Sequence, residues 1–215
     1  MTDVPKAHDV QILTGPAGRQ LAYVAHPGRG PWIVFLSGYA SDMEGTKAVH
    51  LEAWARAQGR AFLRLDYSGH GRSSEAFTDG CIGDWAADAQ AVITAVTDGS
   101  VVLVGSSMGG WIALLLARQM PERIAGMVGI AAAPDFTEDG MWASFDDAQR
   151  KTLWDEGVLM LPSDYDAPYA VTRKIIEDGR NHLVLRAPLP MNFPVRLLQG
   201  SDDVDVLPQV AVALL

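Results

Sequence analysis

The sequence predicts an α/β fold in which helices flank a mostly parallel central sheet. Short apolar runs alternate along the chain with longer stretches of helical character, and this alternation is typical of parallel sheets wrapped by helices. Polar or glycine-rich segments directly follow several of the apolar runs. In parallel sheets, functional sites form at the carboxyl ends of the strands. We therefore expect the residues that carry the function to share one edge of the sheet.

Each element follows from its own residue pattern. Two short opening strands are expected at Gln11–Leu13 and Gln20–Val24, joined by a turn that contains two glycines and a proline. Apolar runs predict buried strands at Trp32–Leu36, Ala61–Asp66, Val101–Val104, Ile124–Ile130 and Pro194–Gln199. Helices are expected at about residues 46–57, 82–96 and 111–117.

The regular alternation stops at Pro134 and returns near Pro194. Between them, large apolar residues are mixed with acidic residues and prolines; they are Phe136, Met141, Trp142, Phe145, Leu153, Trp154, Met160, Tyr165 and Tyr169. We expect a mostly helical cap over the site, whose aromatic residues either line an acyl pocket or form only the core of the cap. The expected organisation is a core at 1–133, a cap insertion at 134–190 and the end of the core at 191–215.

Composition narrows the class of protein. The chain has 215 residues, of which 48% are hydrophobic and 20% charged, enough for one domain with a sizeable core. A net charge of −9 without a basic cluster argues against nucleic-acid partners. No run approaches the roughly 20 apolar residues of a membrane span.

The single cysteine, Cys81, suggests neither a disulfide nor a metal site, and no nucleotide-binding motif is present, so we expect no cofactor and no metal. The first residues resemble neither a secretion signal nor a transit peptide, and we expect a cytoplasmic protein.

The most informative motif is Gly105-Ser106-Ser107-Met108-Gly109, a G-x-S-x-G pattern between an apolar strand and an apolar helix. Only Ser107 has glycine two positions before and two positions after it. Small residues are needed there because the strand and helix backbones approach closely around a strained turn. We expect Ser107 to be a nucleophile; the alternative is a tight turn with an idle hydroxyl.

Further segments carry a resemblance to a known family. They are Leu36-Ser37-Gly38-Tyr39, Gly45-Thr46-Lys47-Ala48, Asp66-Tyr67-Ser68-Gly69, Leu103 to Trp111, Met160-Leu161-Pro162-Ser163 and Arg196 to Gly200. With them the chain resembles the α/β-hydrolase superfamily, and within it a branch of palmitoyl-protein thioesterases and their bacterial relatives. The resemblance implies an α/β-hydrolase fold and removal of acyl groups from cysteine thioesters or from acyl glucuronides.

The family also implies roles for individual residues. The oxyanion of the tetrahedral intermediate would be bound by the backbone N–H groups of Met108 and Tyr39. The Tyr39 side chain could at the same time be a loop aromatic that packs under the cap. The triad acid of the family stands three residues after a glycine that corresponds to Gly200, which selects Asp203, with Asp205 in reserve. A plain acidic turn is the alternative reading of this segment.

The sequence does not show which residue would be the general base of the triad. The family order is serine, acid, histidine, yet residues 204–215 contain no histidine. Among the five histidines, His182 in or beside the cap is the weak candidate, and His70 resembles a structural turn residue of the family. We expect that a final strand and helix are missing, and that the chain is a shortened or frameshifted form of a longer protein.

The sequence therefore predicts a serine hydrolase that cleaves carboxylic esters or thioesters through a Ser107 acyl-enzyme. Its expected partner is a small ester or acyl-thioester substrate, or an acylated protein; the oligomeric state stays open. One alternative is a non-catalytic or impaired binding protein of the same fold that lacks the triad histidine. A serine-type perhydrolase would use the same residues.

Overall fold

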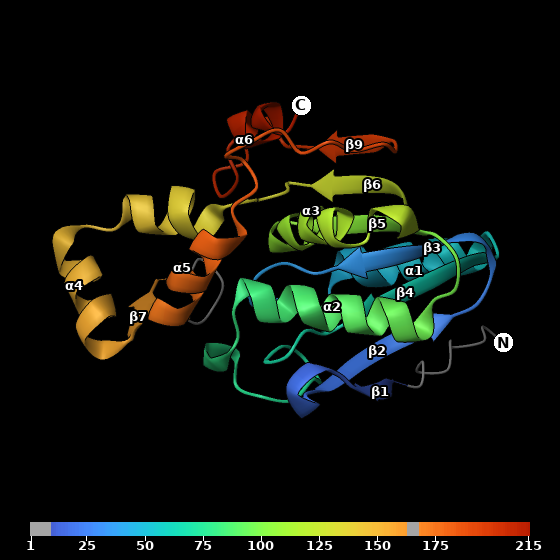
Figure 1. The fold of residues 1–215 in the computed structure, drawn as a ribbon, viewed down its shortest axis with the longest axis horizontal. Helices are drawn as coiled ribbons and strands as arrows, with labels where there is room; N and C mark the ends of the chain where they lie inside the picture. Colours follow the sequence, from blue (N-terminus) through green and yellow to red (C-terminus); the bar gives the residue numbers. More distant parts are fainter. Residues whose placement is uncertain (1–9, 163–167) are drawn as a thin grey trace, which may run out of the picture.

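The computed structural model describes residues 10–162 and 168–215. The strands of the main sheet are β1 (Gln11–Thr14), β2 (Gln20–His26), β3 (Arg29–Leu36), β4 (Arg60–Leu65), β5 (Val101–Ser106), β6 (Ile124–Ile130) and β9 (Val195–Leu198). Within the described residues they form a seven-stranded sheet in the order β1-β2-β4-β3-β5-β6-β9 (Figure 1). β1, β2 and β4 are joined antiparallel, and all later neighbours run parallel. The prediction of an α/β fold with a mostly parallel central sheet is confirmed.

The predicted helices are present as well. The α-helices are α1 (Thr46–Ala57), α2 (Ile82–Val96), α3 (Met108–Gln119), α4 (Asp147–Glu156), α5 (Arg173–Gly179) and α6 (Pro208–Ala213). Single 3₁₀ turns are η1 (Pro16–Gly18), η2 (Phe77–Asp79), η3 (Pro121–Arg123) and η5 (Arg180–His182), and η4 (Phe136–Trp142) is a π-helix. The expected bounds of α1 and α2 agree with the structure.

Helices cover both faces of the sheet, which explains why the central strands are continuously apolar. On one face, Ala48 of α1 belongs to the same cluster as Ile33 and Phe35 of β3. On the other face, Val34 and Leu36 of β3 pack with α2 and α3 in the larger core. Because successive side chains of a strand point to opposite faces, every central position of β3 must be apolar.

The region expected to form a mostly helical cap contains helices and, in addition, a hairpin that the sequence did not predict. The hairpin consists of β7 (Val158–Leu161) and β8 (Tyr169–Thr172), which pair antiparallel as a separate sheet. In Figure 1, α4, β7 and α5 lie beyond the arrowheads of β3 and β6, at the carboxyl ends of the parallel strands. Tyr165 and Ser163, which the sequence analysis singled out, lie outside the described residues, as does His8.

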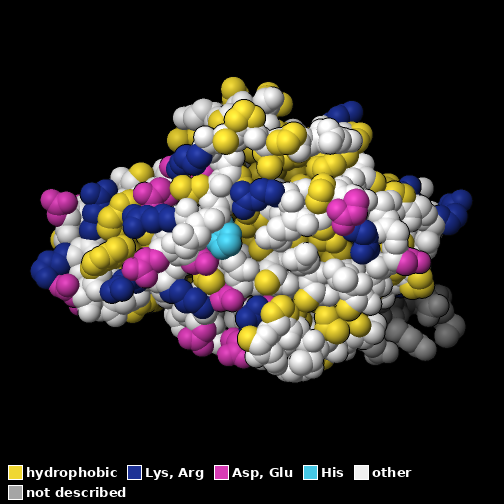
Figure 2. Space-filling view, viewed as in Figure 1, with side chains coloured by type: hydrophobic (Ala, Val, Ile, Leu, Met, Phe, Trp, Pro, Cys, Tyr) yellow, Lys and Arg dark blue, Asp and Glu magenta, His cyan; other side chains and the backbone are white. Residues whose placement is uncertain are grey.

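Strand β9 is the last strand in the sheet order of the described residues. Apolar side chains are exposed on it and on the segment after it: Leu198 is 56% and Val212 67% exposed. Figure 2 shows hydrophobic side chains gathered over α6 and β9 at the top of the molecule. In the part of the chain that the structure describes, no helix is both long and apolar enough to cross a membrane.

Candidate active site

Ser107 lies in the sharp turn between β5 and α3. Its backbone angles are φ 52° and ψ −119°, a region that L-residues other than glycine rarely occupy. Three backbone hydrogen bonds hold it there: its N–H donates to Ile130 O at 3.0 Å, and its carbonyl accepts from Gly110 N at 2.8 Å and Ala133 N at 3.1 Å. The side chain is half-buried. The surrounding backbone thus fixes a strained serine at the carboxyl edge of the sheet.

The two glycines of the motif are required by the close approach of neighbouring backbones. A Cβ on Gly105 would overlap the carbonyl of Gly109, and a Cβ on Gly109 would overlap the carbonyl of Leu36 at the end of β3. Both obstacles are main-chain atoms, which cannot move aside independently. The G-x-S-x-G spacing is therefore a steric requirement of this turn.

The loop after β3 lies directly against Ser107. A Cβ on Gly38 would stand 3.4 Å from the Ser107 Cβ. Among the residues that the structure describes, the N–H of the following Tyr39 donates to no oxygen. The N–H of Met108 belongs to the first turn of α3, where backbone N–H groups have no acceptor within the helix.

The Tyr39 side chain points into the cap. Its hydroxyl donates to Ala170 O of β8 at 2.7 Å, and its ring lies edge-on to Phe77, Phe136 and Tyr169 at centroid distances of 4.8, 5.7 and 6.0 Å. Burial raises the pKa of the phenol well above its usual range. The phenol thus links the loop to β8. The backbone N–H of Tyr39 takes no part in this contact and is available for a different role.

Tyr39→Phe is expected to lower the free energy of unfolding by about 1 kcal/mol, because Ala170 O loses its donor while the ring remains. Reactivity of Ser107 should persist, because the role expected for this residue uses its amide. Chemical denaturation together with active-site labelling measures both. Tyr23→Phe is the control: its hydroxyl donates to an exposed glutamine, Gln11, and its loss should cost less than about 0.5 kcal/mol. Equal losses in the two variants would contradict the role assigned to the Tyr39 hydroxyl.

The same loop is clamped at Met43 by two buried charged side chains from the end of β4. Asp66 Oδ1 accepts from Met43 N at 2.7 Å, and Arg64 Nη1 donates to Met43 O at 2.8 Å. Arg64 in turn forms an ion pair with Glu52 of α1 at 2.7 Å. Burial raises the pKa of Asp66, and the N–H groups of Arg72 and Met43 oppose that shift. The clamp fixes the segment that faces Ser107.

Asp203 lies in the turn after β9. One carboxylate oxygen accepts from Asp205 N at 3.1 Å and Val206 N at 2.9 Å, and the side chain is half-buried, whereas the reserve candidate Asp205 is exposed. Leu198 of β9 is in register with Ile130 of β6, which is in register with Ser106 of β5. Asp203 and Ser107 therefore follow the carboxyl ends of strands in the same sheet.

His182 belongs to η5, and its ring lies against Gly83 in the first turn of α2. Its Nε2 stands 3.4 Å from Asp178 Oδ1, Asp178 Oδ2 accepts from Gly83 N at 2.8 Å, and the His182 carbonyl accepts from Trp111 Nε1 at 3.0 Å. Within the described residues, no hydrogen bond joins its ring to Ser107 or Asp203. The weak candidate for the base thus has an acidic partner, Asp178, that the sequence analysis did not consider.

Across residues 10–162 and 168–215, no group of three or more His, Cys, Asp or Glu side chains is arranged to hold a metal ion.

The strained serine turn, the glycine contacts and the sheet order agree with a comparison against family models, in which residues 31–174 match the α/β-hydrolase fold. The chain belongs to the α/β-hydrolase family.

Within that family the chain is similar to the palmitoyl-protein thioesterase ABHD10, mitochondrial, of Homo sapiens, with 36% identity over 201 residues, and to that of Bos taurus, with 34% over 204. The alignments cover 93% of this chain, and the chain spans 65% of the length of each of these two curated relatives. The solved structure of α/β-hydrolase domain-containing protein 10 from mouse has a TM-score of 0.87 and 33% identity, and covers 96% of this chain and 83% of the other. A crystal structure from Agrobacterium vitis has a TM-score of 0.92 and 37% identity, covering 97% and 85%.

The expectation of a cytoplasmic location is wrong. The ABHD10 relatives from cattle, human, rat, orangutan and mouse are all named as mitochondrial proteins. The expectation depended on the composition of the first few residues, and the physical properties of a folded domain do not record the compartment in which it works.

Proposed function

We propose that this protein is a serine hydrolase that cleaves carboxylic esters or thioesters through an acyl-enzyme on Ser107. The observation that carries the proposal is the strained, half-buried Ser107 turn facing the Gly38–Tyr39 loop. A serine in a sparsely populated backbone conformation persists where its surroundings over-determine it, and such strain clusters at active sites.

In the proposed reaction, Ser107 Oγ forms a bond to the substrate carbonyl carbon while a base takes the hydroxyl proton. The N–H groups of Met108 and Tyr39 stabilise the oxyanion; one such donor typically contributes about 2.7–4 kcal/mol. The bond to the leaving oxygen or sulfur then breaks, and the leaving group receives the proton. Water, activated by the same base, hydrolyses the acyl-enzyme and restores Ser107. Asp203 would orient a histidine base, and His182 is the weaker alternative.

Substrate class is proposed from two sources. The curated relatives are named palmitoyl-protein thioesterases, and we propose an acyl thioester, including that of an acylated protein, as the substrate. The rings of Phe77, Phe136 and Tyr169 around Tyr39 offer apolar surface beside the loop that faces Ser107, which suits an acyl chain.

Covalent labelling with a fluorophosphonate tests the proposal. The chain is expected to react at Ser107. Ser107→Ala should abolish labelling. Ser106→Ala is the matched control: it removes the neighbouring hydroxyl, which fails the motif spacing, and should leave labelling intact. Absence of labelling of the folded parent chain would refute the acyl-enzyme.

A non-catalytic or impaired binding protein of the same fold is the second candidate, because no histidine follows Asp203 in residues 204–215. Lack of labelling of the folded chain would favour it. A perhydrolase would label at the same serine, and only a comparison of peroxide with water as the acyl acceptor separates it from a hydrolase.

A further inference from the structure

Helix α1 begins without a side-chain cap, close to the loop that faces Ser107. Its N-cap residue is Gly45, and no side chain accepts a hydrogen bond from its first turn. In the described part of the chain, no oxygen accepts from the N–H groups of Thr46, Lys47 and Ala48. The start of α1 therefore presents free donors together with the positive end of the helix dipole.

A pocket of about 150 Å³ lies at this end of α1. The first turn of α1 lines one side, and Phe35, Gly38 and Ser106 line the other. Phe35 belongs with Ala48 of α1 to the smaller core, so the pocket lies on the α1 face of the sheet. Gly38 also lies against Ser107, which makes the pocket a neighbour of the candidate nucleophile. At about 30 Å³ for each water molecule, it has room for a group of about five heavy atoms.

The Ser106 side chain is a donor without a partner at this pocket. Val104 packs with Phe35 on the α1 face, and Ser106, two positions further along β5, points to the same face. Ser106 is only 8% exposed, and its hydroxyl makes no hydrogen bond within the described residues. The hydroxyl of Ser37 is completely enclosed, whereas the small exposed surface of Ser106 opens into the pocket. An unpaired hydroxyl at so buried a position needs a partner from outside the chain.

The charges around the pocket favour an anion. Lys47 lines it, and the start of α1 adds about half a positive charge. Asp42 brings a carboxylate to the rim, but its Oδ1 already accepts from Glu44 N at 2.9 Å. The Glu44 carboxylate in turn pairs with Arg64 at 3.3 Å. The free groups at the pocket are therefore donors.

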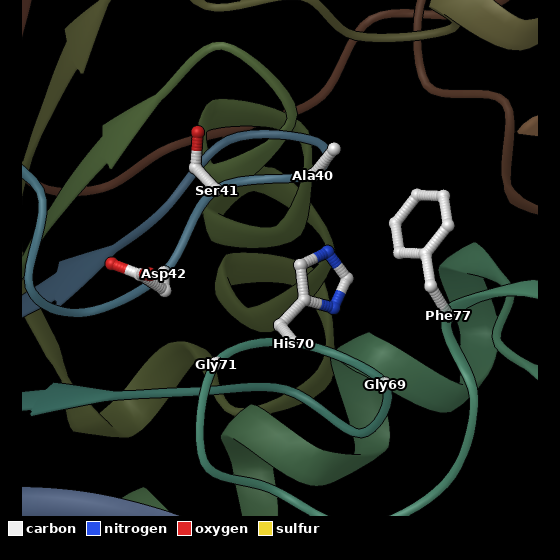
Figure 3. Close-up of a pocket in the computed structure, with 7 residues that line it drawn as sticks. All are labelled: Ala40, Ser41, Asp42, Gly69, His70, Gly71 and Phe77. Carbon is white, nitrogen blue, oxygen red and sulfur yellow. The ribbon is translucent and has the colours of Figure 1, made fainter. Parts of the chain in front are cut away.

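The pocket and the apolar surface proposed for the acyl chain lie on opposite sides of the loop after β3. The Tyr39 ring contacts Phe77 and packs against the larger core, whereas the pocket adjoins the smaller core under α1. In Figure 3, the side-chain oxygens of Ser41 and Asp42 point away from His70 and Phe77. Both residues line the pocket at α1. An acyl chain beside Tyr39 would thus direct the leaving group of the substrate toward α1.

We propose that this pocket binds an anionic group, a carboxylate or a phosphate, on the leaving-group part of the substrate. The inference rests on the proposed function. The oxygens of the anion would accept from the free N–H groups of α1, the Lys47 ammonium and the Ser106 hydroxyl. A fluorophosphonate brings no anionic group to the pocket, so its reaction with Ser107 does not depend on the Ser106 hydroxyl.

A matched pair of thioesters tests the preference. 3-(Butanoylsulfanyl)propanoate and 3-(butanoylsulfanyl)propanamide have nearly the same shape and differ in charge. After correction for uncatalysed hydrolysis, the protein should favour the carboxylate in kcat/KM by about 3- to 20-fold, the combined range for a helix N-terminus and an exposed lysine. Added salt should reduce this ratio. 2-(Butanoylsulfanyl)ethyl phosphate, measured in parallel, shows which of the two anions the pocket prefers.

Two substitutions should move the carboxylate-to-amide ratio in opposite directions. Lys47→Met removes a positive charge from the pocket and should lower the ratio by about 2- to 5-fold. Asp42→Asn removes the negative charge, keeps the acceptor for Glu44 N, and should raise the ratio by a similar factor. Lys151→Met is the matched control, because it removes the same charge from an exposed pair on α4 and should leave the ratio unchanged. A ratio that neither pocket variant changes would overturn the subsite.

A binding measurement separates this inference from the proposed hydrolysis. The inert sulfides 3-(butylsulfanyl)propanoate and 3-(butylsulfanyl)propanamide are added to the ¹⁵N-labelled chain, and the backbone amide resonances of Thr46, Lys47 and Ala48 are followed. Only the carboxylate should shift them, and Ser106→Ala should weaken its binding. A shift without turnover of any thioester would support the subsite and refute the hydrolase. A ratio near one together with unmoved resonances would overturn the subsite whatever the hydrolysis rate.

Discussion

Gly109→Ala is expected to lower the free energy of unfolding by about 3 kcal/mol or more. The added Cβ would overlap the carbonyl of Leu36, and Ser37 O is the next obstacle. Overpacking in a core typically costs about 1–3 kcal/mol, and the cost is at its upper end when the obstacle is main chain. Relief would require β3 to separate from α3, which would also move the Gly38–Tyr39 loop away from Ser107. Urea unfolding followed by tryptophan fluorescence measures the loss.

Gly140→Ala is the matched control for this prediction. Gly140 lies in η4 and is exposed, and a Cβ there would meet only Phe136 Cβ at 3.9 Å, an ordinary contact. In an exposed helical position, alanine is favoured over glycine by up to about 1 kcal/mol. The control should therefore be as stable as the parent chain or more so. If Gly109→Ala unfolds at the same urea concentration as Gly140→Ala, the steric explanation of the motif is wrong.

The central sheet could be predicted because its signals are local. Runs such as Val101–Val104 are apolar at every position, which is what a strand covered on both faces needs, and the structure places β5 inside the sheet, between β3 and β6. The Ser107 turn could be recognised for the same reason. Two glycines at fixed spacing around a serine indicate a turn in which neighbouring backbones approach too closely for a Cβ. The roles of Ser107, Asp203, Tyr39 and Met108 remain predictions.

The β7–β8 hairpin could not be predicted because its stability is not local. Its strands have four residues each, and residues 162–168 separate them in the sequence, a longer span than the two-residue turns that give the strongest hairpin signal. It is held instead by burial of Leu159 and Val171 in the main core, to which residues far away in the sequence contribute. Short apolar runs such as Val158–Leu161 are compatible with helix or strand until that packing is known.

The surroundings of buried charged residues could not be predicted from a sequence pattern either. Arg64 stands among the apolar residues Ala61 to Leu65 of β4, and nothing local indicates that Glu52 of α1 and the carbonyl of Met43 will surround it. The same holds for His70, which in the sequence resembles a structural turn residue of the family: its burial and its unpartnered Nε2 are found only from three-dimensional contacts among the described residues. A charged residue inside a buried apolar run is the one signal that could have drawn attention to Arg64.

Arg64→Met is expected to cost about 3–5 kcal/mol of stability, the range for breaking a buried ion pair by removing one partner. Arg64 and Glu52 are 3% and 2% exposed, and the change would leave the Glu52 carboxylate in the interior without its partner Arg64, beside Arg56 at 3.0 Å. The carbonyl of Met43 would lose its donor as well. Denaturant unfolding measures the loss. Labelling of Ser107 should slow in the folded fraction, because Met43 anchors the loop that faces the serine.

The double variant, Arg64→Met with Glu52→Leu, distinguishes the effect of losing the ion pair from the effect of losing the hydrogen bond to Met43. Removing both charges avoids the uncompensated carboxylate, and such exchanges are often neutral or stabilising by about 1–4 kcal/mol. The Met43 carbonyl still lacks its donor, at a cost of about 1–3 kcal/mol. The double variant should therefore regain most of the stability yet keep the slow labelling of the single variant. Recovery of stability and labelling together would show that Arg64 serves only the ion pair, and recovery of neither would mean that apolar side chains cannot fill the space it occupies.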